Sequence, residues 1–267
     1  ILYTQGRDGP SNLSRLCVKG RYGFDYIHNE QRLTKPLIRK EGVPKDINIE
    51  DFDFENINDI FEETTWENAL NITIKKLKLI KESNPESALA GFGCAKGSNE
   101  EAYLFQKLIR TGFATNNVDH CTRLCHASSV VALLEMIGSG AVSNQVADVT
   151  EADVIVVIGS NPTVNHPVAA TFIKNAAKDG KKLIVIDPKE TQIARHADYF
   201  LQFKPDTDVA LLNAIMKSII DQGLVNDEFI TKRTKDFKEL KKHLEDFTPE
   251  KMSKICGIDK NVINEVA

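Results

Sequence analysis

The chain has 267 residues, of which 42% are hydrophobic and 27% are charged, a composition that excludes a disordered or collagen-like chain. The formal net charge of -4 gives no reason to propose nucleic acid or a membrane surface as a partner. The sequence contains neither an apolar run long enough for a membrane helix nor a signal peptide at its start, so we expect a cytoplasmic protein.

The first 63 residues divide by charge. Residues 1–45 are rich in Gly, Arg and aromatic residues without a sustained period, which predicts loops held in place by a cofactor or a neighbouring domain. Residues 46–63 hold eight acidic residues and no basic one, which favours a solvated linker. We therefore expect a small domain at 1–45, an acidic linker at 46–63 and the main domain at 64–267.

The main domain shows alternating strands and helices. Thr64 followed by Glu67 is typical of a capping box, and apolar residues at helical spacing predict a helix over about 66–82. Apolar strands are expected at 87–93, 152–161, 181–188 and 199–203, and helices at 96–112, 167–180 and 208–223. This alternation predicts an α/β fold with a mostly parallel sheet covered by helices on both faces. Residues 224–267 are expected to be helical, with Pro249 in a first turn.

The loops after the expected strands are short, polar and marked by Gly or Pro. They span residues 94–101, 159–167, 187–191 and 204–208. Gly97 and Gly159 permit close backbone approach, helix N-termini offer amide donors to phosphate, and Asp187 and Asp208 can accept hydrogen bonds from a ring or ribose. The loops thus favour a nucleotide-bearing cofactor, although ordinary turn and cap residues remain an alternative. The usual dinucleotide and P-loop fingerprints are missing from the sequence.

The five cysteines have irregular spacing, which argues against a disulfide framework and for reduced thiols. Cys125 and His126 directly precede an apolar helical pattern, and a thiol at the start of a helix is favoured as the metal-binding thiolate. Cysteine is also commonly a small buried hydrophobic residue, and we expect this of Cys94, Cys121 and Cys256.

A zinc site is an alternative reading of the same segment. It would use Cys121, Cys125, His120 and His126, but a structural zinc usually takes paired ligands from two separated places, and the sequence offers no second pair.

Three segments together resemble the molybdopterin oxidoreductase family and, within it, the alpha subunits of soluble NAD-dependent formate dehydrogenases. They are GRDGPSNLSRLCVKGRYGFDYIH, AGFGCAKGSNEEAYLFQKLIRTGFATNNVDHCTRLCHASSV and VIVVIGSNPTVNHPVAATFIKNAAK. The resemblance implies two molybdopterin guanine dinucleotides that hold molybdenum or tungsten across the mouths of parallel strands, preceded by a small iron-sulfur domain of which residues 1–45 would be the remnant.

The resemblance also assigns roles to residues. Cys125 would be the protein ligand of the metal, with His126 beside the substrate. Cys17 would be the last of four ligands to a 4Fe-4S cluster, with Lys19 between cluster and pterin, where a cation stabilises an arriving electron. Contacts to a pterin or its phosphates would come from Lys96, Gly97, Ser98 and Asn99, and contacts to guanosine from Gly159, Asn161, Pro162, Asp187, Thr207 and Asp208.

The implied activity is the oxidation of formate to carbon dioxide. Electrons would pass by Lys19 and the cluster to partner subunits that carry iron-sulfur centres, FMN and NAD. The chain would be an interior fragment, inactive alone, with three cluster cysteines before residue 1 and a catalytic arginine after residue 267. Two alternatives are a relative that acts on nitrate or another oxyanion, and a non-catalytic relative such as the large iron-sulfur subunit of NADH dehydrogenase. The neighbouring Cys125 and His126 favour formate.

Overall fold

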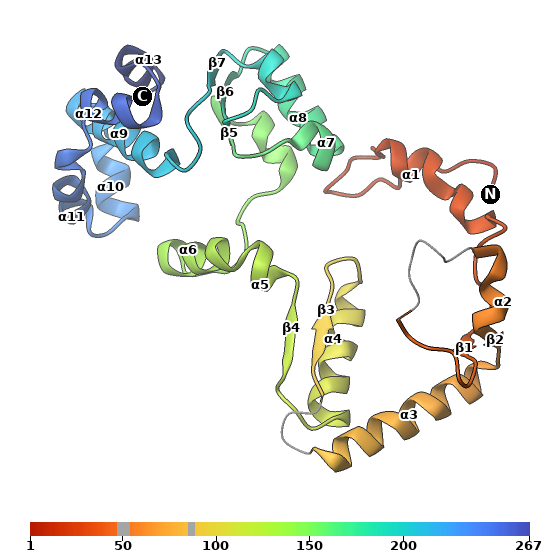
Figure 1. Ribbon diagram of the computed structural model, residues 1–267. Coiled ribbons are helices and arrows are strands. Elements are labelled where there is room, and N and C mark those ends of the chain that lie inside the picture. Colours follow the sequence, from red (N-terminus) through yellow and green to blue (C-terminus); the bar gives the residue numbers. More distant parts are fainter. Residues whose placement is uncertain (47–53, 85–88) are drawn as a thin grey trace. The chain divides into compact units, whose positions relative to one another are not determined.

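The computed structural model describes residues 1–46, 54–84 and 89–267. The chain forms two compact units, one made of Ile1–Phe24 with Asn144–Ala267 and the other of Asp25–Ser143 (Figure 1). The boundaries expected from the sequence, 1–45, 46–63 and 64–267, stay a prediction. Residues 47–53 of the expected linker lie outside the described residues.

The unit of Asp25–Ser143 begins with a small antiparallel pair. Strand β1 (Leu37–Arg39) pairs with β2 (Phe61–Glu63), and a 3-10 turn at Phe54–Asn56 and helix α2 (Ile57–Ile60) precede β2. The described end of the expected linker therefore has regular structure. The long helix α3 (Trp66–Ser83) confirms the helix expected at 66–82.

The start of α3 differs from the expected capping box. The N-cap is Thr65, whose hydroxyl accepts from the Asn68 N–H at 3.2 Å, whereas the Thr64 hydroxyl accepts from the Asn68 side-chain amide at 2.8 Å. The expected capping box of Thr64 and Glu67 was therefore wrong by one residue, because the chain turns into the helix one position later.

A parallel pair of short strands follows in the same unit. Strand β3 (Gly91–Gly93) pairs in parallel with β4 (Val118–His120), and between them lie α4 (Asn99–Lys107) and a π-helical turn (Leu108–Gly112). Helices α5 (Thr122–Cys125) and α6 (Ala127–Ile137) come next. Strand β3 is the described end of the strand expected at 87–93, and β4 was not predicted.

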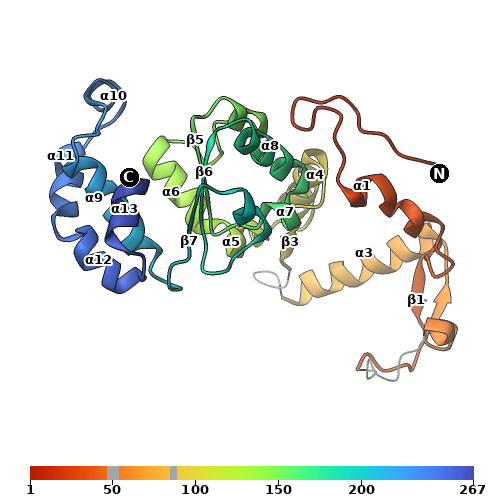
Figure 2. The same cartoon turned by 90° about the horizontal axis from the view of Figure 1, so that it is seen from above.

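The other unit is built on a parallel sheet in the order β5 (Val154–Ile158), β6 (Lys182–Ile186), β7 (Tyr199–Leu201). Helices α7 (Pro162–Asn165) and α8 (Pro167–Lys178) connect β5 to β6, and 3-10 turns lie at Val146–Thr150 and Gln192–His196. Leu183 and Val185 of β6 enter one buried cluster, and Ile184 and Ile186 enter another. Both faces of β6 are therefore buried, and α8 lies along one side of the sheet (Figure 2). Strand β5 keeps one face exposed at Val154, Val156 and Ile158, so the predicted α/β class is confirmed while cover on both faces holds for β6.

Helices form the rest of this unit. They are α9 (Asp208–Asp221), α10 (Asp227–Arg233), α11 (Phe237–His243) with a 3-10 turn at Leu244–Asp246, α12 (Pro249–Cys256) and α13 (Lys260–Val266). Pro249 is the first residue of α12, as predicted. The N-terminal segment adds α1 (Val18–Tyr22) and a 3-10 turn at Gly23–His28. Over the described ranges, no helix combines the length and apolar character needed to span a membrane.

Candidate cofactor-binding site

The carboxyl ends of β5, β6 and β7 lie side by side at one edge of the sheet. The Gly159 N–H donates to the Ile186 carbonyl at 3.0 Å, and the Asp187 N–H donates to the Leu201 carbonyl at 3.2 Å. Gly159 has a φ of +55°, and a Cβ built on it would meet no atom within 4 Å. This edge therefore offers an exposed backbone turn that a ligand can approach.

Three buried polar atoms cluster at the same edge. Among the described residues, Asn161 Oδ1, Thr163 Oγ1 and Thr191 Oγ1 are buried without a hydrogen-bond partner. Asn161 and Thr163 follow β5, Thr191 follows β6, and helix α7 contacts the 3-10 turn after Thr191. A buried polar group without a partner costs about 1–3 kcal/mol, so these atoms suit a ligand rich in hydroxyl and amino groups. A nucleotide-bearing cofactor fits this donor and acceptor set.

The remaining residues expected at this edge hold its turns in shape. Asp187 Oδ1 accepts from the Lys189 N–H at 2.8 Å, and Asp208 Oδ1 accepts from the Val209 N–H at 3.0 Å. The Thr207 hydroxyl donates to the Lys204 carbonyl at 2.6 Å. Each carboxylate has a second oxygen with which it can accept from a ligand.

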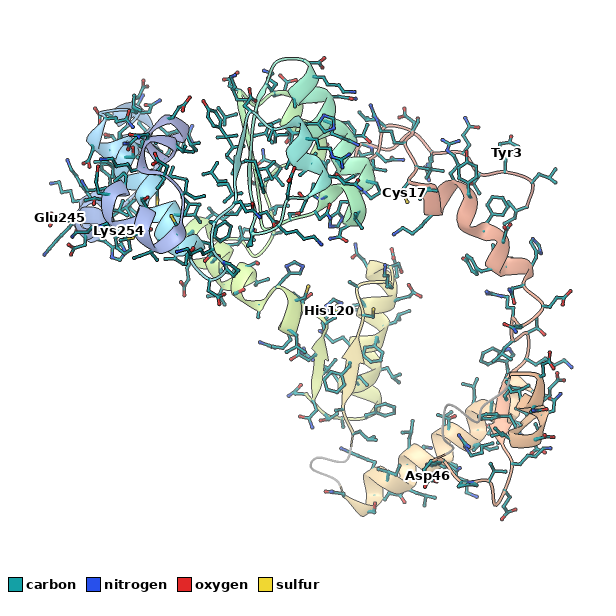
Figure 3. The ribbon with its side chains drawn as sticks, turned by 45° about the horizontal axis from the view of Figure 1, so that its top comes forward. Tyr3, Cys17, Asp46, His120, Glu245 and Lys254 are labelled. Carbon is teal, nitrogen blue, oxygen red and sulfur yellow. The ribbon has the colours of Figure 1, made fainter. Side chains whose placement is uncertain are left out.

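Cys17 caps the start of α1 in the same unit (Figure 3). Its thiol is half-buried, and its pKa is lowered from the ordinary value, first by the backbone N–H of Gly20 and further by the backbone and charge of Lys19. A lowered pKa favours the thiolate, the form that binds metals. Lys19 lies exposed on α1, two residues along.

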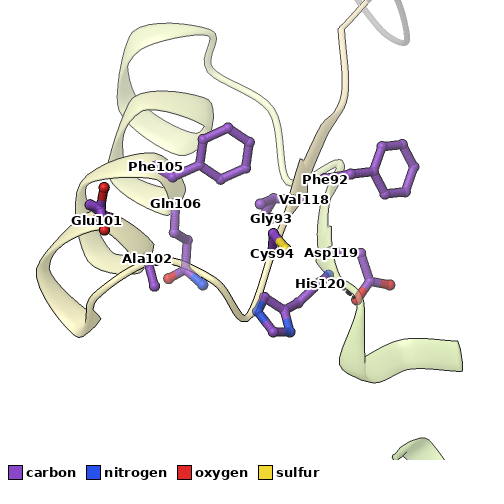
Figure 4. A pocket seen from close by; sticks show the side chains of 11 residues that line it. Phe92, Gly93, Cys94, Glu101, Ala102, Phe105, Gln106, Val118, Asp119 and His120 are labelled. Atoms are coloured by element: carbon purple, nitrogen blue, oxygen red, sulfur yellow. Dashed lines mark hydrogen bonds between the residues drawn. The ribbon is translucent and has the colours of Figure 1, made fainter. Parts of the chain in front are cut away.

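The other unit contains a cavity of about 500 Å³ at the carboxyl ends of β3 and β4 (Figure 4). Residues that line it include Phe92, Cys94, Gly97, Glu101, Gln106 and His120. Lys96 and Gly97 lie in the turn after β3, Ser98 is the N-cap of α4 and Asn99 its first residue. The Glu101 N–H donates to the Ser98 hydroxyl at 3.2 Å, and the Ser98 N–H donates to the Glu101 carboxylate, a complete capping box.

His120 and Asp119 form the β4 side of the cavity. The Thr122 N–H donates to His120 Nδ1 at 3.2 Å, and Cys121 Sγ lies 3.6 Å from the same nitrogen. Asp119 pairs with Arg123 at 2.8 Å, and this guanidinium lowers the pKa of the Asp119 carboxyl. From the sequence, Asp119 was not considered as a site residue and His120 only as a ligand of the alternative zinc site, because β4 has no recognisable strand pattern.

Two of the three cysteines that we expected to be buried are not. Cys94 and Cys121 are exposed, since one lies in the loop after β3 and the other where β4 turns into α5, and this prediction was wrong for both. Cys256 is fully buried in the helical core, which confirms the prediction.

Cys125 ends α5, and His126 is the N-cap of α6; both side chains are exposed. The sulfur of Cys125 is therefore accessible, and it lies beside the start of α6 as expected. Within the described part of the chain, no three His, Cys, Asp or Glu residues are placed so that they could hold a metal ion, including the four considered for zinc.

The structure thus divides the expected site residues between its two units. The unit of Ile1–Phe24 and Asn144–Ala267 holds Cys17, Lys19, Gly159, Asn161, Pro162, Asp187, Thr207 and Asp208. The unit of Asp25–Ser143 holds Lys96, Gly97, Ser98, Asn99, Cys125 and His126.

A model of the family described as molybdopterin oxidoreductase matches residues 32–257, which is most of the chain. The chain belongs to the molybdopterin oxidoreductase family. It is 42% identical over 97% of its length to the F420-dependent formate dehydrogenase subunit alpha of Methanocaldococcus jannaschii, of which it covers 35%. It is 35% identical over its whole length to formate dehydrogenase H of Escherichia coli, of which it covers 36%. The resemblance to the molybdopterin oxidoreductase family and to formate dehydrogenase alpha subunits is thereby confirmed.

A solved structure supports the fold of this molybdopterin oxidoreductase chain. The acetylene hydratase from Pelobacter acetylenicus superposes with a TM-score of 0.75 at 22% identity, over 96% of this chain and 33% of that one. The chain spans about a third of the length of these three proteins.

Proposed function

We propose that this chain is part of the alpha subunit of a formate dehydrogenase, which oxidises formate to carbon dioxide at a molybdenum or tungsten centre held by two molybdopterin guanine dinucleotides. The observation that carries the proposal is the similarity to proteins named formate dehydrogenase over 97% and 100% of the chain. Relatives that act on nitrate, or that pass electrons without a pterin, are the alternatives, and the Cys125 and His126 pair favours formate.

The residues of the two units would hold different parts of the cofactor. Guanosine would be bound by Gly159, Asn161, Pro162, Asp187, Thr207 and Asp208, and a pterin or its phosphates by Lys96, Gly97, Ser98 and Asn99. The partnerless oxygens of Asn161 and Thr191 support the first group, because nucleotide hydroxyl and amino groups can donate to them. When bound, the metal centre supplies the two-electron redox chemistry.

Cys125 and His126 would act at the metal and the substrate. The Cys125 thiolate is a soft ligand suited to molybdenum or tungsten. His126 would orient the formate anion through its ring N–H, or accept a proton on a ring nitrogen. Both side chains are exposed in their unit, so they are accessible to cofactor and substrate.

Cys17 and Lys19 would serve the exit of electrons. The Cys17 thiol, with its lowered pKa, would ligate a 4Fe-4S cluster, and the Lys19 ammonium would stabilise negative charge between cluster and pterin. The acceptor that we infer from the sequence is NAD, reached through a flavin subunit in the cytoplasm. A second candidate is F420, because three relatives 41–42% identical to this chain are named F420-dependent.

The test uses the full-length enzyme with its partner subunits. Cys125→Ser should abolish formate-dependent dye reduction and leave the iron-sulfur signal in the electron paramagnetic resonance spectrum. Cys121→Ser, at an exposed cysteine four residues earlier, is the matched control and should retain activity. Full activity of Cys125→Ser would refute the assignment, and nitrate reduction without formate oxidation would favour the alternative substrate. Assays with NAD and with F420 identify the acceptor.

A further inference from the structure

Phe172 of α8 is buried without belonging to either core of its unit. Its side chain is 4% exposed, yet neither buried cluster of the sheet and the C-terminal helices includes it. Its neighbours Ile173 and Ala176 supply the packing of α8 against the sheet instead. A buried aromatic ring outside the core must be covered from another direction.

Arg15 of the N-terminal segment supplies part of that cover. The guanidinium carbon of Arg15 lies 4.3 Å from the centre of the Phe172 ring, within the range of a cation-π contact. Ile1–Phe24 belongs to the same compact unit as α8, and Figures 1 and 2 both show the loop before α1 beside α7 and α8. Arg15 therefore joins a segment of loops to a helix that packs on the sheet.

The backbone around Arg15 is fixed in an unusual turn. Leu13 and Ser14 have positive φ values of 45° and 62°, which non-glycine residues adopt only when their surroundings impose it. The Asn12 side-chain amide donates to the carbonyls of Arg7 and Arg15, both at 3.0 Å. A Cβ at Gly6 would lie 2.1 Å from the Ser14 carbonyl oxygen, so only glycine fits beside this turn. The turn presents Arg15 in one defined direction.

Arg15 precedes Cys17 by two residues, and α8 directly follows the loop of residues 159–166. The Thr4 hydroxyl lies 2.8 Å from each of the carbonyls of Gly20 and Arg21, which ties α1 to the same segment. The contact between Arg15 and Phe172 thus links α1, whose N-cap is Cys17, to α8, which follows the loop expected to bind guanosine.

We propose that Arg15 is a positioning residue: by stacking on Phe172 it clamps the Cys17 segment to α8, so that the iron-sulfur ligand and the loops at the sheet edge keep a fixed geometry. The role in cluster geometry rests on the function proposed above for Cys17. The clamp itself does not, because it is a contact within the folded chain.

The clamp is tested by hydrogen exchange in the full-length protein with the variants Arg15→Gln, Arg15→Lys and Phe172→Leu. Arg15→Gln should speed exchange of the α1 amides roughly three- to thirtyfold, the loss expected of a cation-π contact between a partly buried guanidinium and a buried ring. Arg15→Lys should restore part of the protection, and Arg15→Gln combined with Phe172→Leu should add little to the larger single effect. Arg32→Gln is the matched control, since Arg32 stacks on exposed Tyr26 at 5.5 Å in the other unit.

The consequence for the cluster has a separate readout. Arg15→Gln should keep the iron content and change the paramagnetic resonance line shape of the cluster, whereas Arg32→Gln should leave it unchanged. Unchanged exchange in Arg15→Gln would overturn the clamp, and changed exchange with an unchanged spectrum would overturn its role at the cluster. Full iron content in Cys17→Ser would instead refute the ligand role of Cys17, and the exchange data would still decide the clamp.

Discussion

Replacing Gly159 by Ala distinguishes two effects at the sheet edge: the loss of folding stability caused by backbone strain, and the loss of cofactor affinity expected if the cofactor lies against the Gly159 backbone. Gly159 has a φ of +55°, where an L-residue costs roughly 1–2 kcal/mol, and the new Cβ meets no protein atom within 4 Å. The expected loss of stability is therefore about 1 kcal/mol, or about 2–4 °C in the melting temperature for a unit of this size. If the cofactor approaches the Gly159 backbone, the added methyl group also collides with it, at a cost of about 1–3 kcal/mol. Such a cost lowers the affinity about ten- to a hundredfold.

Gly223→Ala is the matched control for this experiment. Gly223 has a φ of +68° and equally open space around its Cβ, but it follows the far end of α9. Thermal unfolding should show similar losses for both variants. Guanine nucleotide and metal content, measured on the purified full-length protein, should fall only for Gly159→Ala. Equal cofactor content in the two variants would refute close approach of the cofactor at Gly159.

Two further predictions concern the same sheet. Thr191→Val removes a buried hydroxyl that has no hydrogen-bond partner, so the free energy of unfolding of the cofactor-free protein, measured with denaturant, should rise by about 1 kcal/mol. The affinity of the protein for the cofactor should fall. A cofactor-free variant less stable than wild type would contradict this. The pKa of Asp198 is lowered, first by its hydrogen bond from Lys182 and next by the Leu183 N–H. Its stabilising effect should thus be complete above the unfolded carboxyl pKa near 4 and be lost as pH falls through the lower folded pKa. The stability difference between wild type and Asp198→Asn should shrink on acidification over that range, and a constant difference would contradict the pairing.

The elements that the sequence predicted well are those with a strong periodic signal. Strand β6 is apolar at consecutive positions, a pattern that only a strand buried on both faces requires, and its residues do enter two different clusters. The helices α3, α8 and α9 followed from apolar spacing in the same way. Their bounds came out within a few residues, because the caps that end a helix are decided by single side chains such as that of Thr65.

The cavity at the carboxyl ends of β3 and β4 could not be predicted from the sequence. Strand β4 is three residues long and includes Asp119 and His120, so it has no apolar pattern. Its conformation depends on pairing with β3, whose residues precede their partners in β4 by 27 positions along the chain. Since this pairing is not local, the positions of His120 and Cys94 beside one cavity could not be read from spacing. The exposure of Cys94 and Cys121 follows from the same pairing.

At the edge of the sheet formed by β5, β6 and β7, a well-packed apolar core adjoins buried polar atoms that have no hydrogen-bond partner. Apolar clusters bury both faces of β6, whereas the three partnerless buried oxygens of the described residues all lie in the segments that follow β5 and β6. Without a ligand that donates hydrogen bonds to these oxygens, the folded state bears the cost of burying them unpaired. A cofactor that hydrogen-bonds to these atoms binds only the folded state. It must therefore raise the free energy of unfolding, in proportion to the logarithm of the ratio of ligand concentration to Kd. The loops proposed to bind the cofactor should therefore gain more protection from hydrogen exchange on loading than β6, which is already paired with a strand on each side.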